Sequence, residues 1–124
     1  MFELSKQFRF EAAHTLERVV ETDSSRRIHG HSYRAEVVLQ GEPGPNGMIM
    51  DLTLLERALD AARDGLDHRF LDEIDDLGTP TMENLALWIW RKVQPNCPGL
   101  AKVSVFRDSS GDTCSYYGAK PTMD

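Results

Sequence analysis

The sequence predicts an α+β domain, built from a four-stranded antiparallel sheet with two helices on one face. Three observations lead to it. Two long segments near the N-terminus alternate apolar and polar residues, two central segments repeat apolar residues every three or four positions, and two short alternating segments follow. Strands joined by hairpins favour antiparallel pairing, and two helices inserted together would cover the same face. The 124 residues fit a single domain, residues 1–124.

Alternation defines the expected strands, because successive side chains of a strand point to opposite faces. The four strands are expected at residues 2–14, 29–40, 102–107 and 113–117. The Gly/Pro-rich segment 41–47 predicts a turn that leads into a short further strand at 48–50. The segment 109–112 predicts a hairpin turn. The polar stretch 17–27 is expected to be a surface loop.

Two amphipathic segments define the expected helices. Asp51 or Thr53 is expected to cap the first helix, which runs to about residue 64. Pro80 is expected in the first turn of the second helix, with Thr79 or Thr81 as its cap.

Composition and charge exclude several classes of protein. The chain is 40% hydrophobic, which favours a globular protein, and its net charge of −6 argues against non-specific binding to nucleic acid or to an anionic membrane. The first 14 residues lack the apolar core of a secretory signal, and no apolar run reaches membrane-spanning length. The two cysteines, Cys97 and Cys114, are not expected to form a disulfide. We therefore expect a soluble cytoplasmic protein without nucleic-acid or membrane partners.

Three of the four histidines are expected to meet at one end of the sheet. His29 and His31 lie two residues apart on one strand, so their side chains share a face, roughly 6.5–7 Å apart. Antiparallel pairing would place His14, at the end of the first strand, beside them. Three neutral imidazoles plus an open position are the ligand set of a catalytic zinc site, although imidazole also suits copper, iron and nickel. The alternative interpretation is that these histidines are exposed polar residues at strand ends and have no function.

The fourth histidine, His68, follows Asp67 just beyond the end of the first predicted helix. A carboxylate beside an imidazole can orient and charge it, as in acid–base sites. Taken alone, a surface-loop histidine is the favoured interpretation.

Five short motifs cover nearly the whole chain. They are FEAAH at 10–14, HGHSY at 29–33, GMIMDL at 47–52, LDHRFLDE at 66–73 and PTMENLALWIW at 80–90. Each motif is modest alone, but in this order and at these spacings they are highly specific. Together they resemble the 6-pyruvoyl-tetrahydropterin synthase and 6-carboxy-tetrahydropterin synthase family.

The resemblance implies the tunnelling fold, in which three subunits close a barrel and two trimers stack into a homo-hexamer. It also implies a small-molecule pterin substrate, 7,8-dihydroneopterin triphosphate. In the family, triphosphate leaves and the side chain becomes pyruvoyl or is cut to a carboxylate, the latter feeding queuosine synthesis. Zn²⁺ is the implied cofactor, because a Lewis acid on a hydroxyl oxygen stabilises the anion left by the departing proton.

The resemblance also implies roles for individual residues. The three zinc-binding histidines of the family map onto His14, His29 and His31. Its Asp–His catalytic relay maps onto Asp67 and His68. Two residues of the last motif, Thr81 and Glu83, would line the pterin pocket.

The chain departs from the family pattern at two positions. The family's proton-abstracting cysteine lies four residues before the HGH motif, where this chain has Ser25. A serine hydroxyl does not ionise near neutral pH without a strong adjacent base, unlike a thiol. The family's pterin-anchoring glutamate falls on Arg107 when counted from Val105, and on Asp108 when counted from Tyr116. An aspartate would still grip the guanidine-like edge of the pterin, whereas an arginine would repel or reorient it.

Three functions remain open. The first is an enzyme of this family with a rearranged proton relay, in which His68 or a zinc-bound hydroxide is the base. The second is a zinc-dependent lyase that acts on a related pterin and begins at a hydroxyl rather than at carbon. The third is a non-catalytic pterin or purine binder that keeps the zinc site.

Overall fold

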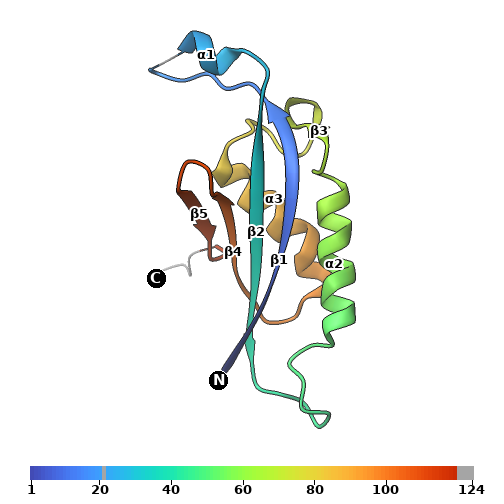
Figure 1. Ribbon diagram of the computed structural model, residues 1–124. Coiled ribbons are helices and arrows are strands. Elements are labelled where there is room, and N and C mark those ends of the chain that lie inside the picture. The colour runs from blue at the N-terminus through green and yellow to red at the C-terminus, as the bar shows by residue number, and fades with distance from the viewer. Residues whose placement is uncertain (21, 120–124) are drawn as a thin grey trace.

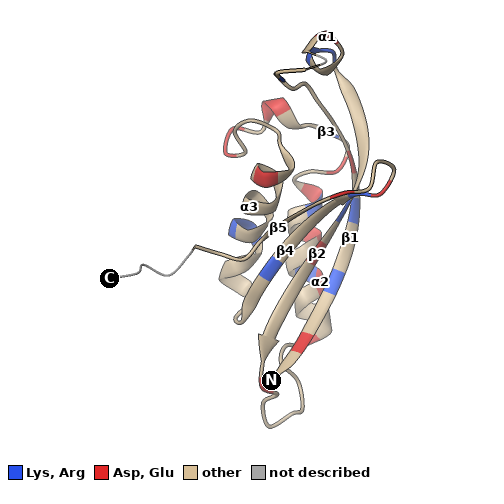
Figure 2. Ribbon diagram, turned by 90° about the vertical axis from the view of Figure 1, so that its left-hand side faces the viewer, with Lys and Arg blue, Asp and Glu red and all other residues tan. Residues whose placement is uncertain are grey.

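The structure is a computed structural model that describes residues 1–20 and 22–119. Its elements in chain order are β1 (Phe2–His14), α1 (Thr22–Arg26), β2 (His29–Gly41), α2 (Leu52–Asp64), β3 (Arg69–Phe70), α3 (Met82–Val93), β4 (Leu100–Arg107) and β5 (Asp112–Tyr116) (Figure 1). The strands form one sheet in the order β3-β1-β2-β4-β5. The two long helices lie on the same side of it (Figure 2). The predicted α+β fold class is confirmed.

The pairing of β1 with β2 positions the histidines. The two strands are antiparallel over their full length, with His14 opposite His29 and Ala12 opposite His31. Along β1, the residues on the helix-facing side are buried toward its end, including Phe10 with 1% of its surface exposed. The alternation therefore carries the three histidines onto the same face as the core, at the end of the sheet.

The sheet differs from the four-stranded antiparallel prediction by one short strand. The four predicted strands are present and pair antiparallel, but β3 adds two residues parallel to β1, with Arg69 opposite Ala12. A two-residue strand has no alternation to detect. The predicted strand at 48–50 is wrong, because a turn closed by the bond from the Gly44 amide to the Met48 carbonyl leads into irregular chain.

The polar stretch 17–27 is also more ordered than predicted, since it contains the five-residue helix α1. Position 21 of that stretch lies outside the described residues. Figure 1 shows α1 beyond the histidine-bearing ends of β1 and β2.

Side-chain caps fix the starts of both long helices. Asp51 caps α2 by accepting a hydrogen bond from the Thr53 amide at 2.8 Å, so Thr53 is not the cap. Thr81 caps α3 by accepting from the Asn84 amide at 3.1 Å. Pro80 therefore precedes the cap instead of lying in the first turn. The caps satisfy amide groups that would otherwise lack a partner at each helix start.

The apolar stripes of α2 and α3 pack on the sheet to form the core. The buried residues of the two stripes are Leu55, Leu59, Ala62, Leu85, Trp88, Ile89 and Val93. Leu52, the first residue of α2, is instead 56% exposed. Both cysteines are free, as expected. No helix in the described ranges has the length and apolar character needed to cross a membrane.

Candidate metal centre

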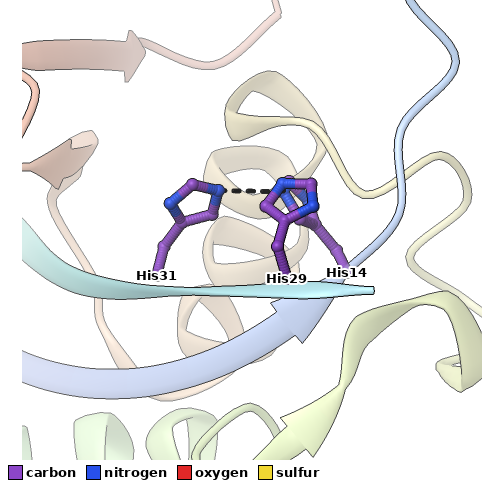
Figure 3. Close-up of side chains that lie close together, drawn as sticks. All are labelled: His14, His29 and His31. Carbon is purple, nitrogen blue, oxygen red and sulfur yellow. Dashed lines mark hydrogen bonds between the residues drawn. The ribbon is translucent and has the colours of Figure 1, made fainter. Parts of the chain in front are cut away.

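Three imidazoles converge at the end of the sheet, one from β1 and two from β2. Figure 3 shows the rings of His14, His29 and His31 pointing toward one another. The Nε2 atom of His14 lies 2.9 Å from that of His29 and 3.1 Å from that of His31. One ligand atom from each ring falls within 4.8 Å of the others, which makes this a cluster that could hold a metal ion.

The outer ring nitrogens show which tautomers are present. His14 Nδ1 lies 2.9 Å from the Pro80 carbonyl oxygen, and His29 Nδ1 lies 2.8 Å from that of Arg27. A carbonyl only accepts, so each Nδ1–H donates and the Nε2 atom of the neutral ring keeps its lone pair. Two lone pairs that face each other at 2.9 Å cannot form a hydrogen bond, but they suit a cation. Backbone carbonyls that orient histidine ligands in this way are typical of metal sites.

The surroundings of His14 and His31 favour the neutral form of both imidazoles. Burial lowers the pKa of His14 below its usual value, with a further contribution from neighbouring His29. Burial, followed by the charge of Arg107, lowers the pKa of His31 to about 4. Because only the neutral imidazole binds a metal, both shifts favour the ligand form at neutral pH.

Arg107 is a charged residue that contacts the cluster. It ends β4 on the helix-facing side of the sheet, and its Nη1 lies 3.4 Å from His31 Nε2. Its Nη2 donates to Asp112 Oδ2 at 2.8 Å. A guanidinium only donates, so this contact also indicates a lone pair on His31 Nε2. Arg107 therefore faces the metal cluster.

Asp108 points to the opposite face of the sheet. Its carboxylate accepts two 3.0 Å hydrogen bonds from Arg34, which holds its pKa below the usual value. The candidate anchor that the structure brings to the histidines is Arg107, and Asp108 is not brought there.

Asp67 and His68 form the expected pair, but away from the three rings. Asp67 Oδ2 lies 3.0 Å from His68 Nδ1, and Asp67 Oδ1 accepts from the Glu11 amide at 2.9 Å. The hydrogen bond from the Glu11 amide and the contact with His68 both hold the pKa of Asp67 below its usual value. His68 is exposed and borders a surface cavity of about 510 Å³ that His31 also lines. Within the described ranges, no hydrogen bond joins this pair to the three histidines.

Ser25 is buried in α1, with 6% of its surface exposed. The loop is closed around it by a 2.7 Å bond from the Leu16 amide to the Ser25 carbonyl. No side-chain hydrogen bond joins Ser25 to any of the three histidines in the described part of the chain.

Thr81 and Glu83 lie at the start of α3. The hydroxyl of Thr81 is committed to the helix cap, and Thr81 directly follows Pro80, whose carbonyl orients His14. Glu83 is exposed, and its charge adds to the burial that raises the pKa of Cys114. The structure brings Thr81 next to the metal cluster through the backbone and leaves Glu83 facing outward.

Three supporting groups were not predicted from the sequence. Two are the backbone carbonyls of Arg27 and Pro80, which fix the tautomers of His29 and His14. Every residue has a backbone carbonyl, so the residue type does not reveal which carbonyls orient a ligand, although Pro80 opens the motif at 80–90. The third is Asp112, which lies in the turn predicted at 109–112 and accepts a hydrogen bond from Arg107.

Comparisons with known proteins agree with this geometry. The model of a family described as 6-pyruvoyl tetrahydropterin synthase matches residues 3–119. A Pyrococcus furiosus protein named dihydroneopterin monophosphate aldolase is 39% identical over 94 residues, which cover 76% of each chain. A Synechocystis protein named 6-carboxy-5,6,7,8-tetrahydropterin synthase is 35% identical over 122 residues, which cover 93% of this chain and 89% of the relative. The solved structure of Caenorhabditis elegans 6-pyruvoyl tetrahydropterin synthase superimposes with a TM-score of 0.79 at 27% identity, covering 95% and 96% of the two chains.

Fold and site together define an α+β protein of the pterin-converting class, with a histidine cluster at the end of its sheet. The chain belongs to the 6-pyruvoyl tetrahydropterin synthase family, and its fold is the tunnelling fold of that family.

Proposed function

We propose that this protein is a zinc-dependent lyase that cleaves the side chain of a phosphorylated 7,8-dihydroneopterin. The observation that carries the proposal is the convergence of three imidazole Nε2 atoms, each with a lone pair directed at the cluster, in a chain of this family. His14, His29 and His31 would hold the zinc ion. Bound there, zinc would polarise a side-chain hydroxyl of the substrate and make its proton easier to remove.

The proposed base is His68. Asp67 orients its imidazole through the 3.0 Å contact at Nδ1, so Nε2 is left to accept a proton. His68 borders a surface cavity and is exposed, so its imidazole is accessible to a substrate. His68 would accept the hydroxyl proton and return it to carbon after bond cleavage.

Ser25 favours a reaction that begins at a hydroxyl. A serine hydroxyl near neutral pH is a far weaker base than a thiolate, so it is poorly suited to abstract a carbon-bound proton. In an aldol-type cleavage, loss of a hydroxyl proton forms a carbonyl at the second side-chain carbon. The bond between the first and second side-chain carbons breaks, and its electron pair moves into the dihydropterin ring until the first carbon is protonated. The name of the Pyrococcus relative, an aldolase, supports this choice.

A second candidate is 6-carboxy-tetrahydropterin synthase activity on 7,8-dihydroneopterin triphosphate. The Synechocystis relative, which aligns with nearly the whole chain, supports it. This reaction requires abstraction of a carbon-bound proton, so a Ser25→Cys variant would increase its rate. If Ser25→Cys leaves that rate unchanged, the rest of the pocket has diverged from the synthases.

Product analysis tests the proposal. Zinc-loaded protein is incubated with dihydroneopterin monophosphate and, separately, with the triphosphate, and the products are separated by chromatography. Aldol cleavage leaves the phosphate on a two-carbon aldehyde, whereas the synthase reaction releases inorganic triphosphate. We expect the aldehyde, and we expect a chelator to abolish its formation. Tight pterin binding without turnover of either substrate would contradict the proposal and indicate a binding protein.

We also propose that the protein works as a homo-hexamer, by its resemblance to the family. Multi-angle light scattering measures this directly, and a stable monomer at working concentration would contradict it.

A further inference from the structure

Arg107 is held beside the metal cluster without a complete set of partners. Its side chain is 24% exposed, and its guanidinium contacts His31 Nε2 and Asp112 Oδ2. Its Nε–H is buried and has no hydrogen-bond partner among the described residues. An unsatisfied buried donor is costly, so turning this guanidinium toward a ligand would regain a missing bond.

The charge balance around Arg107 calls for an anion. A guanidinium keeps its positive charge at any working pH, and a metal ion on the three histidines would add two more positive charges close by. The carboxylate that contacts Arg107 is Asp112, whose Oδ2 also accepts from Ser110 at 2.8 Å. One carboxylate does not neutralise both cations. A negatively charged group of the substrate would, and it would bridge the metal and the arginine.

The donor chemistry of Arg107 sets what it can recognise. A guanidinium has five N–H donors and no acceptor, so it cannot hold the amino edge of a pyrimidine-type ring. It matches the oxygens of a phosphate, often with two parallel hydrogen bonds. Asp108, a carboxylate that could hold an amino edge, is on the other face of the sheet and bonded to Arg34.

We infer that Arg107 is the specificity-determining residue of this site and that it selects substrates by binding their phosphate oxygens beside the metal. The inference rests on the proposed function for the ligand class, a pterin with a phosphorylated side chain. It assigns to Arg107 a different role from anchoring the ring. Asp112 is then a positioning residue, which keeps the guanidinium aimed at the cluster.

Binding measurements test this independently of turnover. The fully oxidised neopterin and its monophosphate serve as probes, and their dissociation constants are measured by titration calorimetry on zinc-loaded protein. We expect wild type to bind the monophosphate more tightly than neopterin. Arg107→Gln should weaken monophosphate binding about 10- to 100-fold while changing neopterin binding less than about threefold. Arg107→Lys, which keeps the charge without the planar fork, should lose only part of the preference.

Arg91→Gln is the matched control, because Arg91 is an exposed arginine near the end of α3. It should leave both dissociation constants unchanged. Zinc content and circular dichroism of each variant report whether the centre is intact. If Arg107→Gln or Arg107→Lys binds zinc but weakens both probes equally, or weakens neither, the inference is wrong and Arg107 is a structural partner of Asp112. If wild type instead shows the Arg107-dependent preference for the phosphate but turns over neither substrate, only the proposed reaction is wrong.

Discussion

The two ring nitrogens of His14 have different partners, and this asymmetry gives the residue its chemistry. Nδ1 is tied to the Pro80 carbonyl, and Nε2 faces the other two rings. With 3% of its surface exposed, His14 has no freedom to turn either nitrogen toward solvent. The ring is therefore held with its lone pair directed at the cluster before any ligand arrives.

We expect His29→Ala to abolish stoichiometric zinc binding, because it removes one of only three imidazole ligands. Elemental analysis of purified protein should show about one zinc per chain in wild type and almost none in the variant. His68→Ala is the control, since the imidazole of His68 contacts Asp67 and, within the described ranges, bonds to none of the three cluster histidines; it should keep its zinc. Full zinc content in His29→Ala would contradict the assignment of the metal site.

Gly65 is required for close packing. Its φ of −78° suits any residue, but a Cβ built there would lie 2.7 Å from Trp88 Cη2. Alanine reduces the entropy of the unfolded chain by up to about 1 kcal/mol, yet overpacking costs about 1–3 kcal/mol, so the clash prevails. We expect Gly65→Ala to lower the free energy of unfolding by about 1–2 kcal/mol in urea titrations. Gly44→Ala, whose Cβ would have no contact under 3.5 Å, should be nearly neutral, and equal losses in both variants would refute the packing argument.

Arg107 and Asp108 are neighbours in sequence, so a shift of one position decides which of them faces the cluster from the end of β4. Alternation places Val103 and Val105 in the core, so Arg107 follows on the same face and Asp108 on the other. Counting from Val105 and counting from Tyr116 predict different residues, because the residue types do not fix the length of the turn between β4 and β5. The histidine cluster was predictable for the opposite reason, since its three members lie on two long strands with clear alternation.

At the scale of elements, the loop before α3 is fastened to that helix by one carboxylate. Asp76 accepts from the indole Nε1 of Trp88 at 2.8 Å and from Lys92 Nζ at 3.0 Å. These bonds hold the pKa of Asp76 below its usual value. Because Trp88 is only 5% exposed, its N–H depends on this partner.

We expect Asp76→Ala to lower the free energy of unfolding by about 1–3 kcal/mol, because the indole N–H loses its acceptor. Asp76 has a lower pKa folded than unfolded, so it stabilises the protein above about pH 4 and this stabilisation is lost as the pH falls further. The gap between wild type and variant in thermal melts should therefore narrow in acid. Asp75→Ala, at the exposed neighbouring position, serves as the control. An identical gap at pH 3 and pH 7 would refute the role of the ionised carboxylate.

The elements that the sequence predicted are those long enough to show a period. β1 and β2 each span 13 residues, and α2 and α3 span 13 and 12. β3 has two residues and α1 has five, so each contains little more than one period and shows no repeating pattern. The prediction of a strand at 48–50 was wrong because it rested on apolar character alone. A segment forms a strand only if a neighbouring strand offers unpaired backbone groups, and the sequence does not show this.

At the scale of the whole molecule, the histidine cluster links stability to pH. In the metal-free protein, folding holds His14 and His31 neutral with lowered pKa values, about 4 for His31. Unfolded histidines protonate near pH 6.5. The unfolded state therefore binds more protons below that pH, and stability falls as the pH is lowered from about 6.5 toward 4.

We expect the melting temperature of chelator-treated protein to fall between pH 7 and pH 5, and His31→Asn to reduce that fall. Arg91→Gln, at an exposed position near the end of α3, is the control and should leave the fall unchanged. The same pH dependence in wild type and His31→Asn would show that other groups cause it.

The pairing of His14 with His29 has a consequence for how this family changes its chemistry. A metal ion held by both residues would close residues 15–28 into a loop, as a cross-link does. The entropy of closing a loop rises by only about 0.6 kcal/mol for each doubling of its length. Residues can thus be inserted or exchanged in the loop, which includes Ser25, with little effect on the ligand set at its base. We therefore expect metal affinity and the group at position 25 to be separable traits. A graft of a relative's residues 15–26 that leaves Arg27, whose carbonyl orients His29, in place would change the second without disturbing the first.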